Sequence, residues 1–105
     1  MTIEEFKNLT VPYQWKRSEN IFYKFYNRFA PDTLIVISNG VSKAHQCTIR
    51  EYEGSILFTS PITDGKEVAL TVSKNREQIT FHTSEPFTVI AVPNPLIAKS
   101  TTTRE

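Results

Sequence analysis

The sequence predicts a mainly β protein, a small antiparallel β-sandwich or barrel with a short N-terminal helix. Three observations support this fold class. From residue 32 onward, β-branched and apolar runs alternate with turn residues about every ten positions, as antiparallel strands do. No segment of helical periodicity separates these runs, which argues against parallel βαβ units. The length of 105 residues suits one domain with a single core.

The short helix is expected at residues 3–8. Thr2 and Glu5 have the spacing of a capping box, in which each side chain accepts a hydrogen bond from the other residue's backbone amide. Residues 10–12, with two β-branched side chains and a proline, disfavour a longer helix.

Residues 13–29 contain seven of the twelve aromatic residues, and two geometries fit residues 19–29. As a helix, this segment has Ser18 as its N-cap and Pro31 beyond its end. As a strand, it forms a hairpin with a first arm at residues 11–16 and a turn at 18–20. Aromatic residues fit strands well and are only middling helix formers, which favours the hairpin slightly. The period of so short an apolar run does not decide between them.

Six further strands are expected, separated by turn residues. Asn39-Gly40 favours a type I′ hairpin turn because both residues tolerate positive φ, and Glu53-Gly54 marks another turn. The expected strands cover residues 33–37, 46–50, 56–59, 68–72, 79–83 and 87–92. Together these elements predict a single β-rich domain over 1–92, followed by an extended C-terminal arm over 93–105.

The composition argues against several classes of function. The net charge is only +1, whereas a protein dedicated to duplex DNA would carry a larger basic excess. Three glycines are too few for a Gly-rich phosphate loop, and no cofactor is expected. No apolar run is long enough to span a membrane, and the acidic N-terminus is unlike a secretory signal. We therefore expect a cytoplasmic or otherwise non-secreted protein, with no membrane partner, that can be incorporated into a particle.

No catalytic site is expected. His45 and Cys47 fall on one face of a strand, and His82 is the only other histidine, but no fourth zinc ligand is evident. A free cysteine on an apolar face is usually a small core residue, so no metal site is predicted either. The acidic residues lie at turns or are scattered along strands, without the pairing that acid–base chemistry needs.

The candidate binding residues all lie in the aromatic segment, where rings alternate with basic side chains. They are Tyr13, Trp15, Lys16, Arg17, Tyr23, Lys24, Tyr26 and Arg28. Trp, Tyr and Arg dominate the energetics of protein interfaces, and aromatic rings beside cations also suit single-stranded nucleic acid. The competing interpretation is a structural one, because each buried aromatic contributes about 2–3 kcal/mol and so small a domain needs several.

These observations predict a non-enzymatic structural or protein–protein interaction module. Such a chain would be a subunit or accessory piece of a larger assembly, for example a virion or another multi-subunit particle, as a homo- or hetero-oligomer. The alternative is a small β-barrel that binds single-stranded nucleic acid through an aromatic and basic face.

Overall fold

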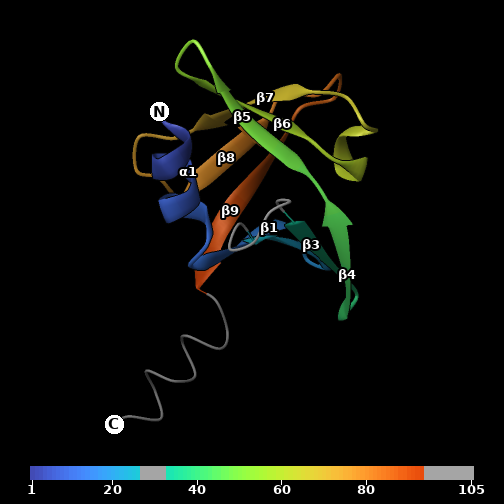
Figure 1. Ribbon diagram of the computed structural model, residues 1–105. Coiled ribbons are helices and arrows are strands. Elements are labelled where there is room, and N and C mark those ends of the chain that lie inside the picture. The colour runs from blue at the N-terminus through green and yellow to red at the C-terminus, as the bar shows by residue number, and fades with distance from the viewer. Residues whose placement is uncertain (27–32, 94–105) are drawn as a thin grey trace, which may run out of the picture.

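The computed structural model describes residues 1–26 and 33–93 (Figure 1). Within these residues the chain forms one α-helix, one short 3-10 helix and nine strands. They are α1 (Ile3–Thr10), β1 (Tyr13–Ser18), β2 (Ile21–Tyr26), β3 (Thr33–Ser38), β4 (Val41–Gln46), β5 (Thr48–Tyr52), β6 (Ser55–Thr59), η1 (Pro61–Thr63), β7 (Val68–Val72), β8 (Gln78–Phe81) and β9 (Phe87–Pro93).

The nine strands form one antiparallel sheet in the order β4-β3-β2-β1-β9-β8-β7-β6-β5. Every neighbouring pair is consecutive in the sequence except β1 and β9, which join the first half of the chain to the last strand. The outermost strands of this order, β4 and β5, follow each other along the chain with only Cys47 between them. The sheet therefore curls into a nearly closed barrel, and the prediction of a mainly β sandwich or barrel with a short N-terminal helix is confirmed.

Segments β4 and β5 act together as one bent strand. β4 pairs with β3 through the turn at Asn39-Gly40, and β5 pairs with β6 through the turn at Glu53-Gly54. All four turn residues have positive φ, from 49° to 81°, as type I′ turns require; this turn type was predicted for Asn39-Gly40, and Glu53-Gly54 was predicted as a turn without a type. Backbone N–H and C=O groups point alternately to the two sides of a strand. In this segment the first half bonds to β3 on one side, and the second half bonds to β6 on the other side. The bent strand thus links the two ends of the sheet.

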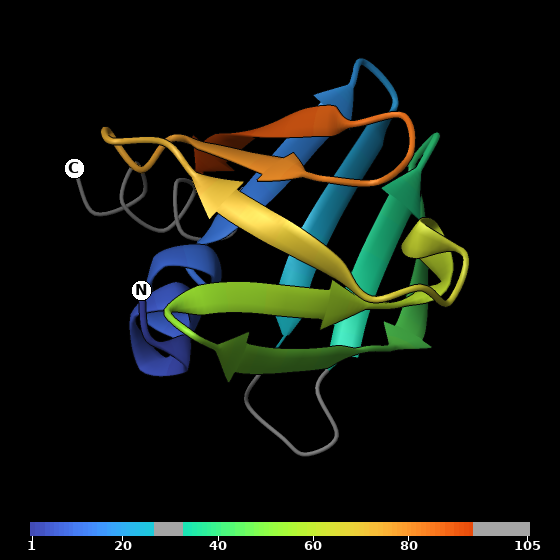
Figure 2. The same ribbon diagram turned by 90° about the horizontal axis from the view of Figure 1, so that it is seen from above.

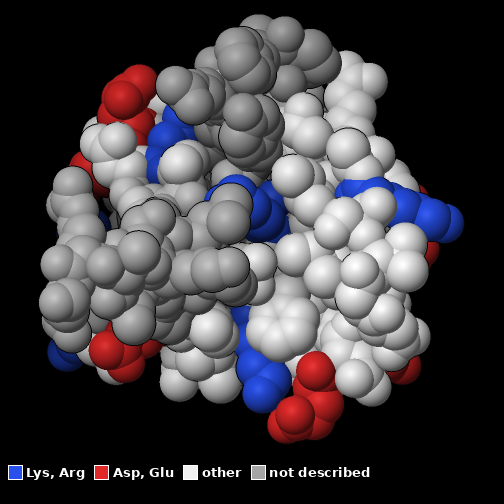
Figure 3. All heavy atoms as spheres, turned by 90° about the horizontal axis from the view of Figure 1, so that it is seen from below, with Lys and Arg blue, Asp and Glu red and all other residues white. Residues whose placement is uncertain are grey.

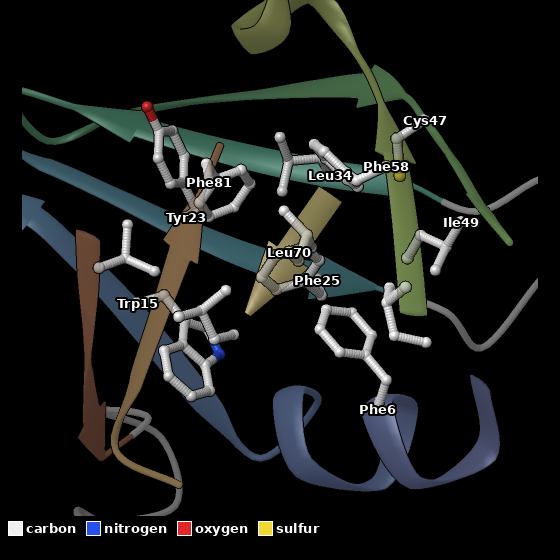
Figure 4. Packing of buried hydrophobic residues seen from close by; sticks show 13 residues of the cluster. Phe6, Trp15, Tyr23, Phe25, Leu34, Cys47, Ile49, Phe58, Leu70 and Phe81 are labelled. Atoms are coloured by element: carbon white, nitrogen blue, oxygen red, sulfur yellow. The ribbon is translucent and has the colours of Figure 1, made fainter. Parts of the chain in front are cut away.

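The interior is filled by alternate residues of the strands and by side chains of the helix, of which Phe6 is completely buried. Phe6 points from α1 toward Phe25 of β2, with the ring centroids 5.5 Å apart (Figure 4). Phe25 in turn packs against Phe58 and Phe81, at 5.7 and 6.4 Å. Helix α1 thereby covers one end of the barrel core.

The aromatic segment is a hairpin with its turn at residues 19–20, so the strand geometry is correct for residues 21–26 and the helical alternative is wrong over 19–26. Tyr23 and Phe25 are buried while Lys24 between them faces outward, which is the alternation of period two that a strand imposes. Residue propensities alone did not distinguish a strand from a helix here. The sheet does, because β2 pairs with β1 on one side and with β3 on the other. The segment 27–32 lies outside the described residues.

The other boundaries differ only in detail from the predictions. The capping box is present, with Glu5 N donating to Thr2 Oγ1 at 3.1 Å and Thr2 N donating to Glu5 Oε1 at 3.2 Å. Helix α1 runs to Thr10, whose buried hydroxyl donates to Phe6 O at 2.9 Å. The strand expected at 46–50 is part of the longer β4–β5 segment.

The residues of β4 were not predicted as a strand because their side chains are mostly polar and exposed. This half of the bent strand has a neighbour on one side only, so its sequence lacks a strong pattern of burial. Of the predicted arm at 93–105, Pro93 belongs to β9, and residues 94–105 lie outside the described part of the chain.

The two ends of the barrel differ (Figure 2). At one end lie α1, the β5–β6 turn and the β7–β8 turn. At the other lie the β1–β2, β3–β4 and β8–β9 turns together with η1, and no α-helix covers this end in the described residues. We call this second end the open end. No helix within residues 1–26 and 33–93 combines the length and the apolar character needed to cross a membrane.

Candidate functional site

The outward side of β2, β3 and β9 carries apolar side chains that do not belong to the core. They are Phe22, Ile35, Ile37, Ile90 and Val92, and we call them the apolar outer patch. Ile90 is 50% exposed and the other four are half-buried.

Strand register places apolar side chains on both sides of Lys16. Ile37 of β3 lies opposite Phe22 of β2, and Phe22 lies opposite Lys16 of β1. Lys16 lies opposite Ile90 of β9 on its other side. These residues form one row across four strands, and Lys24 joins the patch beside them because it lies opposite Ile35. Directly opposed side chains on one sheet face are close enough to make contact.

The other half of the barrel has a more polar outer surface. The outward residues of β5 to β8 are Thr48, Arg50, Tyr52, Ser55, Leu57, Thr59, Ala69, Thr71, Gln78 and Thr80. Several of them bond to one another or to adjacent polar residues: the Arg50 guanidinium pairs with the Glu67 carboxylate at 2.6 Å, and the Thr80 and Thr88 hydroxyls lie 3.0 Å apart. The outer surface of the barrel is therefore richer in aliphatic side chains on the side of β2, β3 and β9 than on the side of β5 to β8.

Figure 3 shows the barrel from the side of β1 to β4. Where residues are described, this surface is largely uncharged, with basic side chains near its middle and acidic side chains toward its margins. This distribution agrees with the positions of Lys16 and Lys24 among apolar neighbours.

Two of the predicted binding residues belong to the core. Trp15 has no exposed surface, and Tyr23 is 2% exposed. The indole Nε1 of Trp15 donates to the carbonyl of Thr10 at 3.2 Å, so its polar group is satisfied inside the protein. The Tyr23 ring packs 6.4 Å from those of Phe81 and Phe87. Burial assigns both rings a structural role, because a side chain without exposed surface cannot touch a partner.

The four other predicted residues whose side chains are described lie in three places. Lys16 and Lys24 face outward within the apolar outer patch, and Lys16 pairs with Glu19 at 3.3 Å. Tyr13 is 37% exposed at the start of β1, with its ring 6.2 Å from that of Trp15. Arg17 is directed to the open end of the barrel. Tyr26 is the last residue of β2, and its side chain is not among those that the structure describes. Arg28 lies outside the described residues. Binding by these residues stays a prediction.

A cleft of about 350 Å³ lies at the open end. Its walls are Arg17 near the end of β1, residues 62–64 and 66 around η1, the turn at 83–85, and Phe87 at the start of β9. Both signs of charge are represented, since Lys66 and Glu85 also line it. The mouths of β-barrels are common positions for small-molecule sites.

The residues considered for catalysis or metal binding do not come together. Cys47 is 3% exposed within the bent strand, and His45 lies two residues before it. His82 follows β8, where its Nε2 lies 2.6 Å from the Thr71 hydroxyl. In the described part of the chain, no three His, Cys, Asp or Glu side chains are grouped in a way that suits a metal ion.

Sequence reasoning missed the aliphatic members of the apolar outer patch. The signal was present in β3 and β9, whose sequences TLIVIS and FTVIAVP are apolar at both odd and even positions. Such runs indicate a strand buried on both faces, whereas a strand with one solvated face alternates with polar residues. Here the second face is the outside of the barrel, where these side chains are half-buried or exposed.

In comparisons with known proteins, no family model, no curated protein and no solved structure matches this chain.

Proposed function

We propose that this chain is a non-enzymatic interaction module, a subunit or accessory piece of a larger assembly, that binds a protein partner through its apolar outer patch. The observation that carries this proposal is the row of outward side chains across β3, β2, β1 and β9, which is apolar except for Lys16 and includes the half-exposed Ile90. Contiguous apolar surface on a folded protein commonly marks an interaction site.

The partner we propose is a second copy of this chain. An apolar patch is complementary to itself, so two copies related by a two-fold axis bury the same residues on both sides. Lys16 does not oppose this arrangement strongly, because it is already paired with Glu19 of its own chain. Lys24 lies beside Ile35, and its aliphatic stem can pack along the apolar surface while the ammonium group stays in water.

The experiment is size-exclusion chromatography with light scattering at tens of micromolar protein. We expect a mass above that of the 12.0 kDa monomer for the wild-type chain, and a shift toward the monomer for Ile90→Lys. A charge placed in a buried interface is costly to desolvate, while the half-exposed position lets the monomer fold. Leu57→Lys is the matched control, because Leu57 is an outward apolar residue of β6 on the opposite side of the barrel.

A wild-type chain that is strictly monomeric under these conditions contradicts self-association. Equal loss of association in Ile90→Lys and Leu57→Lys contradicts the apolar outer patch as the interface. Circular dichroism of each variant separates loss of binding from loss of folding.

Binding of single-stranded nucleic acid is the second candidate function. It is supported by Phe22 and Lys24 on the outward side of β2 and by Lys16 opposite Phe22, a small set of the ring and cation groups that such proteins use. The isoleucines of the same surface offer no ring for a base to stack on, so the protein partner is favoured. Salt-sensitive oligonucleotide binding that Lys24→Gln weakens would reverse this ranking.

A further inference from the structure

Arg17 occupies a special position in the β1–β2 hairpin. Lys16 pairs with Phe22 and Ser18 pairs with Ile21, so Arg17 is an extra residue with no opposite partner on β2. Such a bulge redirects a side chain, and bulges are over-represented beside functional sites. Here the redirected side chain reaches the cleft at the open end of the barrel.

Two contacts fix the Arg17 guanidinium in that place. Its Nη1 donates to the Tyr23 hydroxyl at 2.7 Å, and its central carbon lies 3.8 Å from the centroid of the Phe87 ring. Both supporting rings are held by the core: Tyr23 is buried, and Phe87 stacks on Phe81 at 4.7 Å with 11° between the planes. Figure 4 shows the Tyr23 hydroxyl directed away from the other labelled side chains. The guanidinium is therefore held in position before any ligand arrives.

The hydrogen-bonding capacity of this guanidinium is mostly unused. It has five N–H donors, of which one bonds to Tyr23. No carboxylate in the described part of the chain lies within ion-pair distance of it. An arginine held by two neighbours without a counter-ion is suited to bind an anionic group, and its planar fork matches the two oxygens of a carboxylate.

The rest of the cleft indicates which anion fits. Lys66 adds a second positive charge, whereas Asp64 and Glu85 add two negative charges. This balance disfavours a multiply charged phosphate and is compatible with a single negative charge placed at Arg17. Half-buried Ile62 lines the same cleft and offers apolar contact to the rest of a ligand. The volume of about 350 Å³ lies near the lower limit for small-molecule sites.

We propose that the open end of the barrel binds a carboxylate group, held by Arg17 in the cleft between η1 and the β8–β9 turn. The carboxylate belongs either to a small organic acid or to the C-terminus of a peptide. This site lies at the end of the barrel rather than on its outer face, so it is independent of the proposed interface.

The test is a titration followed by two-dimensional NMR of the backbone amides, with benzoate, inorganic phosphate and a tripeptide with a free or an amidated C-terminus as probes. We expect saturable shifts with benzoate or the free peptide, concentrated at residues 62–66 and 83–85. Arg17→Gln should weaken this binding at least about tenfold, as expected for a lost charge-assisted bond. Arg17→Lys should also weaken it, because lysine keeps the charge without the fork.

Arg76→Gln is the matched control, since Arg76 is an exposed arginine at the covered end, 3.9 Å from Glu5, and its replacement should leave the titration unchanged. Tighter binding of benzoate identifies a small acid as the source of the carboxylate, and tighter binding of the free peptide, with none of the amidated form, identifies a C-terminus. The proposal is overturned if neither saturates, if phosphate binds more tightly than both, or if Arg17→Gln binds as well as the wild type.

Discussion

Trp15 combines complete burial with a hydrogen bond from its indole nitrogen to the Thr10 carbonyl. The sequence shows a tryptophan among basic residues, which is equally typical of an interface and of a core. The structure separates these roles through strand register: Trp15 lies opposite Tyr23 on one side and Ala91 on the other, all on the inward face. The tyrosine and tryptophan rings that suggested a binding surface thus stabilise the junction between β1, β2 and β9.

We predict that Trp15→Phe lowers the free energy of unfolding by about 1–3 kcal/mol, because it leaves a buried carbonyl without its donor and removes part of the packing. Trp15→Ala should cost about 3–5 kcal/mol, as large-to-small changes in a core do. Urea denaturation measures both losses. A Trp15→Phe protein with unchanged stability would contradict the structural role of the indole nitrogen.

The two type I′ turns differ at their first position. Asn39 and Glu53 have nearly the same φ, 52° and 49°, but asparagine tolerates this left-handed conformation better than glutamate. Glu53→Asn should therefore raise the free energy of unfolding by up to about 1 kcal/mol, and Asn39→Glu should lower it by a similar amount. Thermal unfolding of the pair provides the comparison. The reasoning fails if the two substitutions shift stability in the same direction.

At the scale of elements, an ion pair connects β5 to the start of β7 across β6. Arg50 donates to both oxygens of Glu67 at 2.6 Å, and this hydrogen bonding lowers the pKa of the Glu67 carboxyl and raises that of Arg50. The capping box has the same effect at α1, where hydrogen bonding from the Thr2 backbone lowers the pKa of Glu5. In both cases the folded state favours the ionised carboxylate.

A carboxyl whose pKa is lowered on folding contributes stability above its ordinary value of 4.5, and this contribution is lost as the pH falls through the folded-state pKa. Glu67→Gln should accordingly lower the melting temperature at pH 7, and the difference from the wild type should shrink below about pH 4.5. Because both side chains are partly exposed, the effect should be small and should weaken with salt. Glu85→Gln, which removes a carboxylate that has no ion pair in the described residues, is the charge-matched control.

The predicted elements succeeded where local chemistry was sufficient. The capping box at Thr2 and Glu5 placed the start of α1, and Asn39-Gly40 placed a hairpin because few other residues adopt its backbone conformation. β4 was missed because its exposed polar side chains carry no burial pattern of their own. Its pairing with β3 is a property of the sheet rather than of its sequence.

At the scale of the whole molecule, closure of the barrel places the two candidate surfaces. The bent β4–β5 segment joins the ends of the sheet, and β9 returns to pair with β1. This return brings Ile90 into line with Phe22 and Ile37, although they come from distant parts of the chain. It also brings Phe87 beneath Arg17. Neither the apolar outer patch nor the cleft exists before the barrel closes.

The sequence by itself determined the fold class, the helix start, the type I′ turn at Asn39-Gly40 and most strands, because capping, turn chemistry and side-chain alternation act between near neighbours. It also placed Arg17 and Lys24 among the candidate binding residues. Only the tertiary structure decided that residues 21–26 form a strand, that Trp15 and Tyr23 lie inside, and that Lys24 and Arg17 face different surfaces. The physical reason is that the partners of a strand give it an inside and an outside, and one partner of β1 is β9, more than sixty residues away in the sequence.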